Sequence, residues 1–320
     1  MNTFFMAALA PTTRATYRSG LKAYRLFCGQ MGFPLFPLEQ YILQLFVTAL
    51  ALRLSFATIK VYLSGIQYES RILGFHESIS SMNKLFYVLR GIKRTQGSKW
   101  LRKKRKPITP VHLRHMLDFI HNSLFTVHDK AMWKCLVLVA FFGLMRVSEY
   151  VCPSSTSFDP TIHLSVRDFQ LSSCGKSVAI NIKASKTDPF RAGIQIRLVA
   201  IGNLFCPVMA VTQYLRLTGS RSGPCFVLSH GDFVTRKYVS AFVRISLPQC
   251  IDLDTHSFRI GGASAAASCG VPDSVIKILG RWSSDCYRRY LRISDNVIKD
   301  CLLKVSCLDN TNKIWDIDSI

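Results

Sequence analysis

Residues 280–292 read GRWSSDCYRRYLR and place Tyr290 a short helix after Trp282. Three motifs precede this segment: HSFR at 256–259, SKTD at 185–188 and GLMRVSE at 143–149. In a chain of net charge +22, the four segments together supply two arginines, a histidine, a lysine and a tyrosine: Arg146, Arg259, His256, Lys186 and Tyr290. These are the groups needed to break a phosphodiester without a metal.

Each of these groups answers a chemical need. A phenol has a pKa of about 10 and is a weak nucleophile until a base or a cationic field helps it. Charge builds on the non-bridging phosphate oxygens in the transition state, and guanidinium groups match those oxygens bidentately. The leaving 5′ oxygen needs a proton, which a lysine of lowered pKa can supply.

The GLMRVSE and SKTD motifs also have ordinary structural interpretations. Arg146 and Glu149 have the spacing of a helical ion pair, and Ser148 and Glu149 could equally orient Arg146. Lys186 lies in a turn between two predicted strands, where Lys183, three residues away, is its rival.

The HSFR motif stands at a predicted helix start, with Asp254 or Thr255 as the cap. The spacing directs His256 and Arg259 from one helical face, and a helix N-terminus favours an anionic ligand. The glycine- and alanine-rich residues 261–267 suit close helix packing beneath a site. The alternative is a capped surface helix.

Composition predicts a globular chain with a polyanionic partner. The 320 residues suffice for two domains, and 49% of them are hydrophobic. Lys and Arg outnumber Asp and Glu by 41 to 19, which favours nucleic acid first and an anionic membrane surface second. The longest apolar run, residues 135–145, is too short to cross a bilayer, and the first ten residues lack the basic start of a signal peptide. We therefore expect a soluble chain.

The eleven cysteines show no Cys-x-x-Cys spacing, so the sequence predicts neither a zinc ribbon nor a redox motif. Several stand in apolar stretches, and we expect small buried hydrophobic residues in a reducing compartment.

Hydrophobic periodicity predicts four helices in the N-terminal part: one from residue 11, then 38–53, 56–73 and about 82–93. In the third helix, Ile59, Leu63, Ile66 and Ile72 are expected to point inward. From residue 109 we expect helices at 110–121 and 128–145, extended runs at 162–171, 177–182 and 194–199, and helices again from 206.

Residues 96–108 are interpreted as a basic linker between domains at 1–95 and 109–320. Its cations are expected to follow DNA phosphates, and residues 102–106 could also serve as a nuclear import signal. The candidate DNA-binding residues are Lys93, Arg94, Arg102, Lys103, Lys104, Arg105 and Lys106.

Taken in order, the motifs resemble those of the tyrosine recombinase (phage integrase) family over roughly residues 11–300. GLMRVSE resembles the first arginine box with one residue more than the usual Gly-Leu-Arg, HSFR the second box, and Lys186 with Thr187 the hairpin lysine. Strict counting puts Arg281 in the third-box slot, and Trp282 stands one residue later. We favour Trp282. The Gly-Arg-Trp wording is similar to that of eukaryotic transposon recombinases of the DIRS and Crypton kinds.

The resemblance implies a mainly α fold with a small antiparallel β-sheet (α+β). An N-terminal helical, SAM-like core-binding domain would bind DNA, and a tyrosine-recombinase catalytic domain would follow. The implied function is a site-specific recombinase or integrase in the nucleus. It would act as a tetramer on double-stranded DNA with no metal or other cofactor.

The resemblance also implies a mechanism. Tyr290 would attack the scissile phosphate to form a 3′-phosphotyrosyl link, and Lys186 would protonate the 5′ oxygen. Arg146 and Arg259 would clamp the phosphate, and His256 would assist proton transfer. Trp282 would pack against the phosphate or hydrogen-bond to it.

Three alternatives remain at this point. The chain could be a DNA-binding protein that derives from such a recombinase and no longer reacts, or an enzyme like type IB topoisomerases. A basic membrane-surface or scaffold protein is the third, but it explains none of the ordered motifs. The presence of every expected polar residue favours the active enzyme.

Overall fold

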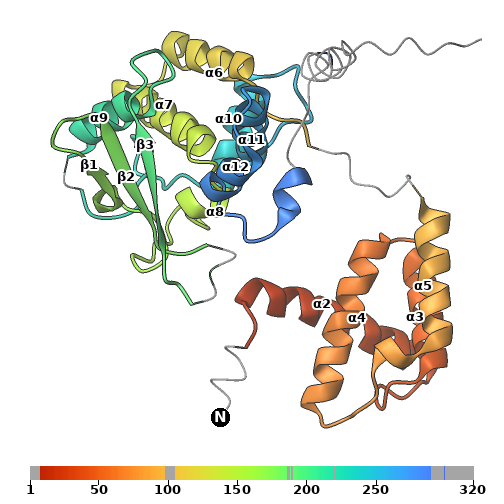
Figure 1. Cartoon of the computed structure of the whole chain (residues 1–320). Helices are drawn as coiled ribbons and strands as arrows, with labels where there is room; N and C mark the ends of the chain where they lie inside the picture. The colour runs from red at the N-terminus through yellow and green to blue at the C-terminus, as the bar shows by residue number, and fades with distance from the viewer. Residues whose placement is uncertain are drawn as a thin grey trace, which may run out of the picture. The chain divides into compact units, whose positions relative to one another are not determined.

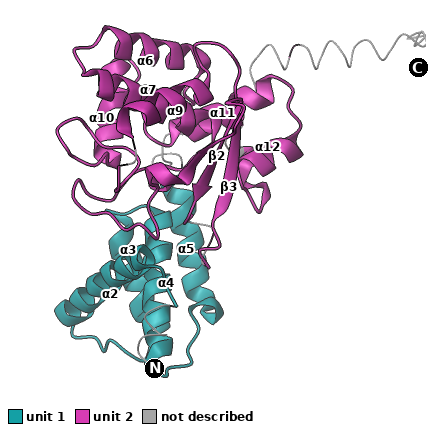
Figure 2. Ribbon diagram, turned by 90° about the vertical axis from the view of Figure 1, so that its left-hand side faces the viewer, with its two compact units in different colours: residues 1–103 teal, residues 104–320 magenta. Residues whose placement is uncertain are grey.

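The structure of the chain is a computed structural model that describes residues 8–97, 105–185, 188, 190–219, 221–289 and 299 (Figure 1). The chain divides into two compact units, Met1–Lys103 and Lys104–Ile320, which are coloured separately in Figure 2. The division falls inside the basic segment that the sequence analysis interprets as a linker.

Unit 1 is helical. Its elements are α2 (Pro11–Met31), α3 (Gln40–Ala51), α4 (Phe56–Ile72), the short 3-10 helix η1 (Ile79–Ser81) and α5 (Asn83–Gln96). Helix α2 packs on α4, and α3 packs on α5 (Figure 1). The four predicted helices are confirmed, with ends that differ from the expectation by a few residues.

The core of unit 1 follows the predicted helical periodicity. Ile59, Leu63 and Ile66 of α4 are buried, as expected. Ile72 is 47% exposed, so its predicted inward position is wrong. It is the last residue of α4, beyond the last buried residue of this helix, Ser70.

Two glycines allow α2 and α4 to approach closely. A Cβ atom on Gly65 would lie 2.8 Å from the Cα of Tyr17, and one on Gly20 would lie 2.8 Å from the Cα of Tyr62. Each helix therefore presents a glycine to a tyrosine backbone of the other. Since real Cβ atoms do not come this close to backbone, a larger residue at either position would force the helices apart.

Unit 2 surrounds a buried helix. Its helices are α6 (Pro110–Asn122), α7 (Val127–Phe142), α8 (Val147–Tyr150), α9 (Pro207–Thr218), α10 (Arg236–Ser246), α11 (Ser257–Ser268), α12 (Asp273–Leu279) and the 3-10 helices η2 (Val166–Asp168) and η3 (Asp285–Arg289). Helix α7 contacts α6, α9 and α11, and nearly all its side chains from Ala131 to Phe141 are buried. Among the described residues, no helix is long and apolar enough to span a membrane.

The close packing expected of residues 261–267 is present where α11 meets α7. A Cβ atom on Gly262 would lie 2.4 Å from the carbonyl oxygen of Phe141 and 2.4 Å from a methyl carbon of Leu144. The absence of a side chain at this position brings α11 against the end of α7. This contact places the second arginine motif next to the first.

One antiparallel sheet lies beside these helices, with strand order β1-β2-β3. Its strands are β1 (Phe169–Leu171), β2 (Ser177–Ile182) and β3 (Ile194–Val199). The predicted bounds of β2 and β3 are confirmed. Ser177 pairs with Val199 and Ile182 with Ile194, so the two strands form a hairpin.

The first predicted extended run, residues 162–171, is wrong over most of its length. Only its last three residues form a strand. The Asp168 carboxylate accepts hydrogen bonds from the backbone N–H and the hydroxyl of Ser165, both at 2.7 Å, and this capping box folds the residues between them into η2. Local side-chain bonds thus outcompete the strand ladder here.

The predicted fold class is confirmed: the protein is mainly helical with one small antiparallel sheet. The cysteines are more varied than expected. Five of the described ones are buried, namely Cys28, Cys135, Cys152, Cys206 and Cys225, whereas Cys174 and Cys269 are exposed.

Candidate functional site

The first arginine stands just beyond the end of α7. The sequence predicts that this helix continues to residue 145, but it ends at Phe142. Leu144 adopts a left-handed backbone conformation, with φ of 45°, which turns the chain. Arg146 is then the N-cap of the four-residue helix α8. The turn exposes the carbonyl oxygen of Leu144 to side chains from α11 and from the segment after α12.

Glu149 of α8 is the centre of a hydrogen-bond cluster. Its side chain has no solvent exposure. One carboxylate oxygen accepts from the backbone N–H of Arg146 at 2.8 Å and from Nη2 of Arg281 at 2.8 Å. The other accepts from Nη1 of Arg146 at 2.9 Å and from the hydroxyl of Ser185 at 3.0 Å. Both oxygens are therefore fully hydrogen-bonded, as a buried carboxylate requires.

The electrostatics of Glu149 agree with this geometry. Burial pushes the pKa of the Glu149 carboxyl upward, but the charges of Arg281 and Arg146 and the bonds from Arg146 outweigh burial and hold the pKa below its usual value. Glu149 is therefore ionised at neutral pH. The side chain of Arg146 is 16% exposed, and its Nε and Nη2 have no partner among the described residues. That edge of Arg146 is available to an anion.

The second arginine lies in the first turn of α11. Arg259 is fully buried, and its guanidinium donates to the carbonyl oxygens of Leu144 and Gly280. It also stacks on the indole ring of Trp282, with 4.4 Å from the guanidinium carbon to the ring centroid. The carbonyl of Leu144 also accepts from Nη2 of Arg281 at 3.2 Å. Leu144 thus joins Arg259 to the Glu149 cluster.

His256 is the N-cap of α11, so the predicted caps Asp254 and Thr255 are one or two residues too early. Instead, the Asp254 carbonyl accepts from the N–H of Ser257 at 2.8 Å. Burial, followed by the charges of Arg105, Arg259 and Arg146, lowers the pKa of His256 to about 4. The imidazole is therefore neutral at pH 7 and is surrounded by cations.

The two third-box candidates both lie in the site, where Trp282 contacts Arg259 and Arg281 contacts Glu149. Trp282 is 6% exposed and covers Arg259, and the centroid of the Tyr287 ring lies 6.0 Å from that of the indole. Arg281 has a left-handed φ of 57° and directs its guanidinium to Glu149. Its Nη1 also donates to the Gly143 carbonyl at 3.0 Å.

Of the two rival lysines, Lys183 is the one that the structure describes. Lys183, next to the end of β2, forms an ion pair with Asp168 at 2.7 Å and lies 3.3 Å from the carbonyl oxygen of His163. It is thus held by η2, the short helix next to the sheet. Lys186 and Tyr290 lie outside the described residues, as do Arg102, Lys103 and Lys104.

The described members of the predicted DNA-binding set fall into two groups. Lys93 and Arg94 are exposed in the last turn of α5 in unit 1. In unit 2, Arg105 lies 4.0 Å from Asp254, and Lys106 lies 3.3 Å from Asp252. These acidic residues belong to the segment that leads into His256, so the end of the basic segment is anchored next to the arginine site.

Sequence reasoning missed Ser185 and the contact between Arg281 and Glu149. The hydroxyl of Ser185 accepts from Arg146 at 3.0 Å and donates to Glu149, which closes a triangle of side chains. The available signals were weak. Ser185 immediately precedes the predicted lysine, and Arg281 occupies a motif position.

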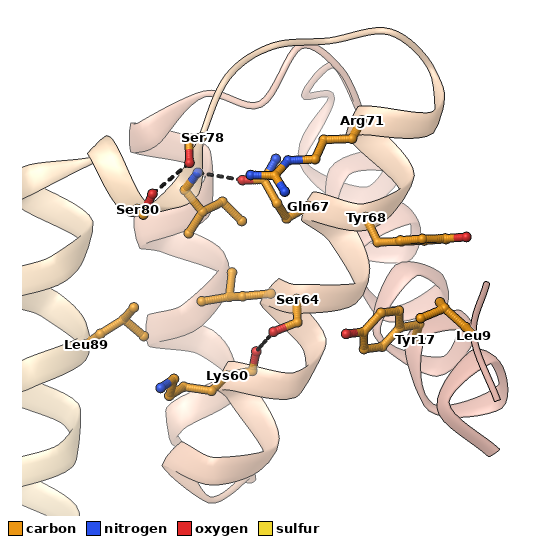
Figure 3. A pocket seen from close by; sticks show the side chains of 12 residues that line it. Leu9, Tyr17, Lys60, Ser64, Gln67, Tyr68, Arg71, Ser78, Ser80 and Leu89 are labelled. Atoms are coloured by element: carbon orange, nitrogen blue, oxygen red, sulfur yellow. Dashed lines mark hydrogen bonds between the residues drawn. The ribbon is translucent and has the colours of Figure 1, made fainter. Parts of the chain in front are cut away.

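A separate pocket of about 420 Å³ lies in unit 1 between α2, α4 and η1 (Figure 3). Tyr17 and Tyr68 lie side by side on its wall with ring centroids 5.8 Å apart, and Lys60 and Arg71 also line it. None of its lining residues belongs to the arginine site. Among the described residues, no group of three or more histidine, cysteine or acidic side chains could hold a metal ion.

No family model matches the sequence, and no curated protein matches it. Solved structures with a similar fold do exist. The Tn1549 transposon integrase in complex with transposon right end DNA has a TM-score of 0.60 and 10% identity, over 93% of this chain and 95% of that chain. A lambda integrase dimer bound to a COC′ core site has a TM-score of 0.56 and 13% identity, over 89% of each chain.

The XerH site-specific recombinase, in a post-cleavage complex with a palindromic difH substrate, has a TM-score of 0.55 and 16% identity. The match covers 85% of this chain and 72% of that chain. At these identities the likeness shows the fold, which is that of tyrosine recombinases and integrases across both units.

Proposed function

We propose that this protein cleaves and rejoins duplex DNA as a site-specific recombinase or integrase of the tyrosine recombinase type. The main support is the convergence of three guanidinium groups on two shared acceptors, next to His256, whose pKa is lowered by burial and by the charges of nearby arginines. Arg146 and Arg281 share the carboxylate of Glu149, and Arg259 and Arg281 share the carbonyl of Leu144. Three fixed positive charges thus stand against one carboxylate.

A buried excess of positive charge is unfavourable by itself, and a bound anion would offset it. A phosphodiester fits because its two non-bridging oxygens match guanidinium donors, and its transition state carries more charge than its ground state. The unpartnered edge of Arg146 is where we place the first phosphate contact. Trp282 would support Arg259 as the second clamp through their stacking contact.

His256 suits proton transfer in its neutral form, because a neutral imidazole offers one donor and one acceptor nitrogen. Burial keeps the imidazole neutral, and the nearby arginines add to this by disfavouring a further positive charge. In the proposed reaction it assists removal of the Tyr290 proton, Tyr290 attacks the phosphorus, and the 5′ oxygen departs with a proton from Lys186. The phosphotyrosyl bond conserves the energy of the broken bond, so rejoining needs neither ATP nor a metal.

DNA is the proposed partner for reasons of fold and charge. The integrase and recombinase structures described above are complexes with DNA. Residues 8–97 of this chain contain eleven Lys and Arg but three acidic residues, all glutamate. We propose that both units contact the duplex and that four copies assemble on two sites. We also propose residence in the nucleus as part of a eukaryotic transposable element, with residues 102–106 as an import signal.

A nicked duplex that traps the cleaved state tests the proposal. Wild-type protein should form a covalent DNA adduct, Tyr290→Phe should form none, and mass spectrometry should place the modification on Tyr290. Tyr287→Phe is the matched control and should keep the adduct, because the Tyr287 hydroxyl already bonds Asp273 at 3.0 Å.

Two other outcomes would contradict the proposal. Sequence-specific binding with no adduct would identify a DNA-binding protein that no longer reacts. Relaxation of supercoils at single sites, without strand exchange between sites, would identify an enzyme that acts as a type IB topoisomerase.

A further inference from the structure

Arg281 has an unusual conformation and few accessible donors. It follows α12 with a left-handed backbone that non-glycine residues seldom adopt, and its N–H bonds the carbonyl of Ile278 at 2.9 Å. Its side chain is 6% exposed. Such a conformation in a buried arginine indicates that the position of the guanidinium is specified by its surroundings.

The donors of Arg281 are directed at protein groups. Nη1 bonds the carbonyl of Gly143 at 3.0 Å, and Nη2 bonds the carbonyl of Leu144 at 3.2 Å and Glu149 at 2.8 Å. Its Nε is buried without a hydrogen-bond partner among the described residues, so solvent does not reach it. Arg146, on the opposite side of the same carboxylate, instead keeps the Nε edge described above available. Only one of the two arginines therefore presents donors to an incoming anion.

We propose that Arg281 is a positioning residue that fixes the orientation of Arg146 through Glu149. This inference rests on the proposed function, in which Arg146 clamps the scissile phosphate. Without Arg281, the oxygen of Glu149 nearest to it loses its charged donor, and the carboxylate can rotate toward Arg146. Arg146 would then be drawn along Glu149 and away from the phosphate.

Trp282 and Arg281 thus have parallel roles. Trp282 lies against Arg259, and Arg281 reaches Arg146 by way of Glu149. A direct contact between Arg281 and the phosphate is the competing role, and strict motif counting favours it. The two roles differ in one measurable respect. A positioning residue depends on the arginine that it positions, whereas a phosphate ligand contributes independently of it.

The test is a double-mutant cycle on covalent adduct formation by the full chain, under single-turnover conditions with saturating nicked duplex. Arg281→Ala should slow the reaction by about 10- to 100-fold, by analogy with the loss of a hydrogen-bond partner that orients a metal ligand. DNA affinity should change little. In an Arg146→Lys background the same change should have almost no further effect. Arg281→Lys keeps a positive charge beside Glu149, so its reaction rate should fall between those of wild type and Arg281→Ala.

Arg221→Ala is the matched control, because Arg221 is also partly buried and donates to backbone carbonyls, those of Pro224 and Cys225. It should react at the wild-type rate. Thermal unfolding of each variant identifies loss of fold, and Arg281→Lys carries the test if Arg281→Ala does not fold. Rate losses that multiply across the cycle, or a wild-type rate for Arg281→Ala, would overturn this inference alone. A wild-type protein that forms no Tyr290 adduct would overturn the proposed function and the inference together.

Discussion

Glu149 binds Arg146 at 2.9 Å and Arg281 at 2.8 Å, so one buried carboxylate joins two arginines that stand 135 positions apart in the chain. Arg146 comes from the end of α7 and Arg281 from the end of α12. The cluster of Glu149 and the two arginines therefore connects two parts of unit 2. Its geometry depends on the packing of α7 against α11.

The close packing of α2 against α4 in unit 1 can be tested by adding one methyl group. Gly65→Ala should destabilise the protein by about 1–3 kcal/mol, because its Cβ has no room beside the backbone of Tyr17. Gly29→Ala, on the exposed side of α2, is the control. Nothing lies within 4 Å of its new Cβ, and it should be neutral or stabilising by up to about 1 kcal/mol. Urea denaturation of both variants measures the difference, and equal effects would contradict this close packing.

Stability should fall as pH drops from about 6.5 toward 4, because of His256. Its pKa in the folded protein is about 4, below the ordinary value of 6.5, so the unfolded chain binds the proton first. The full stability is present above pH 6.5 and declines as pH falls toward the folded pKa. Each pKa unit is worth about 1.4 kcal/mol, and partial solvent screening reduces this, so we expect a loss of about 1–2 kcal/mol by pH 4.5.

Denaturation of wild type and His256→Gln across this pH range measures that loss. The variant should lack most of the decline between pH 6.5 and 5, whereas the exposed His121→Gln should retain it. A decline of the same size in wild type and His256→Gln would show that other groups cause it.

Local patterns predicted the helices and the β2–β3 hairpin because their residues repeat at 3.6 or 2 positions. The strand prediction for residues 162–171 failed because a single carboxylate, that of Asp168, folds three residues into η2. The left-handed conformation of Leu144 could not be predicted, since its carbonyl is held by Arg259 and Arg281 from distant segments. The order of the motifs therefore predicts which residues belong to the site, but not how they are arranged. Their arrangement depends on long-range contacts.

The stacking of Arg259 on Trp282 predicts that, for stability and adduct formation, an aromatic ring at position 282 matters more than the size of the indole. Trp282→Leu should weaken the protein by at least about 2 kcal/mol and slow adduct formation, because a desolvated cation–π contact and a buried ring are lost together. Trp282→Phe keeps a ring face for the guanidinium and should be milder in both respects. Unfolding and single-turnover cleavage of the two variants test this. Equal rates for Leu and Phe would show that the stacking has no part in the reaction.

Ser185 predicts a link between the arginine cluster and the leaving group. Its hydroxyl bonds Arg146 and Glu149 at the end of the β2 side of the hairpin, one residue before Lys186. A hydrogen bond to a charged group is worth about 1.5–3 kcal/mol, so Ser185→Ala should slow cleavage about tenfold or more.

If the lost anchor acts through Lys186, the deficit concerns protonation of the 5′ oxygen. A duplex with sulfur at that bridging position needs no such proton, because thiols ionise near a pH of about 8.5. On this substrate Ser185→Ala and Lys186→Ala should both approach the wild-type rate, and Ser177→Ala, at the other end of β2, should match wild type on both substrates. A Ser185→Ala deficit that persists with sulfur would instead assign the serine to the phosphate clamp alone.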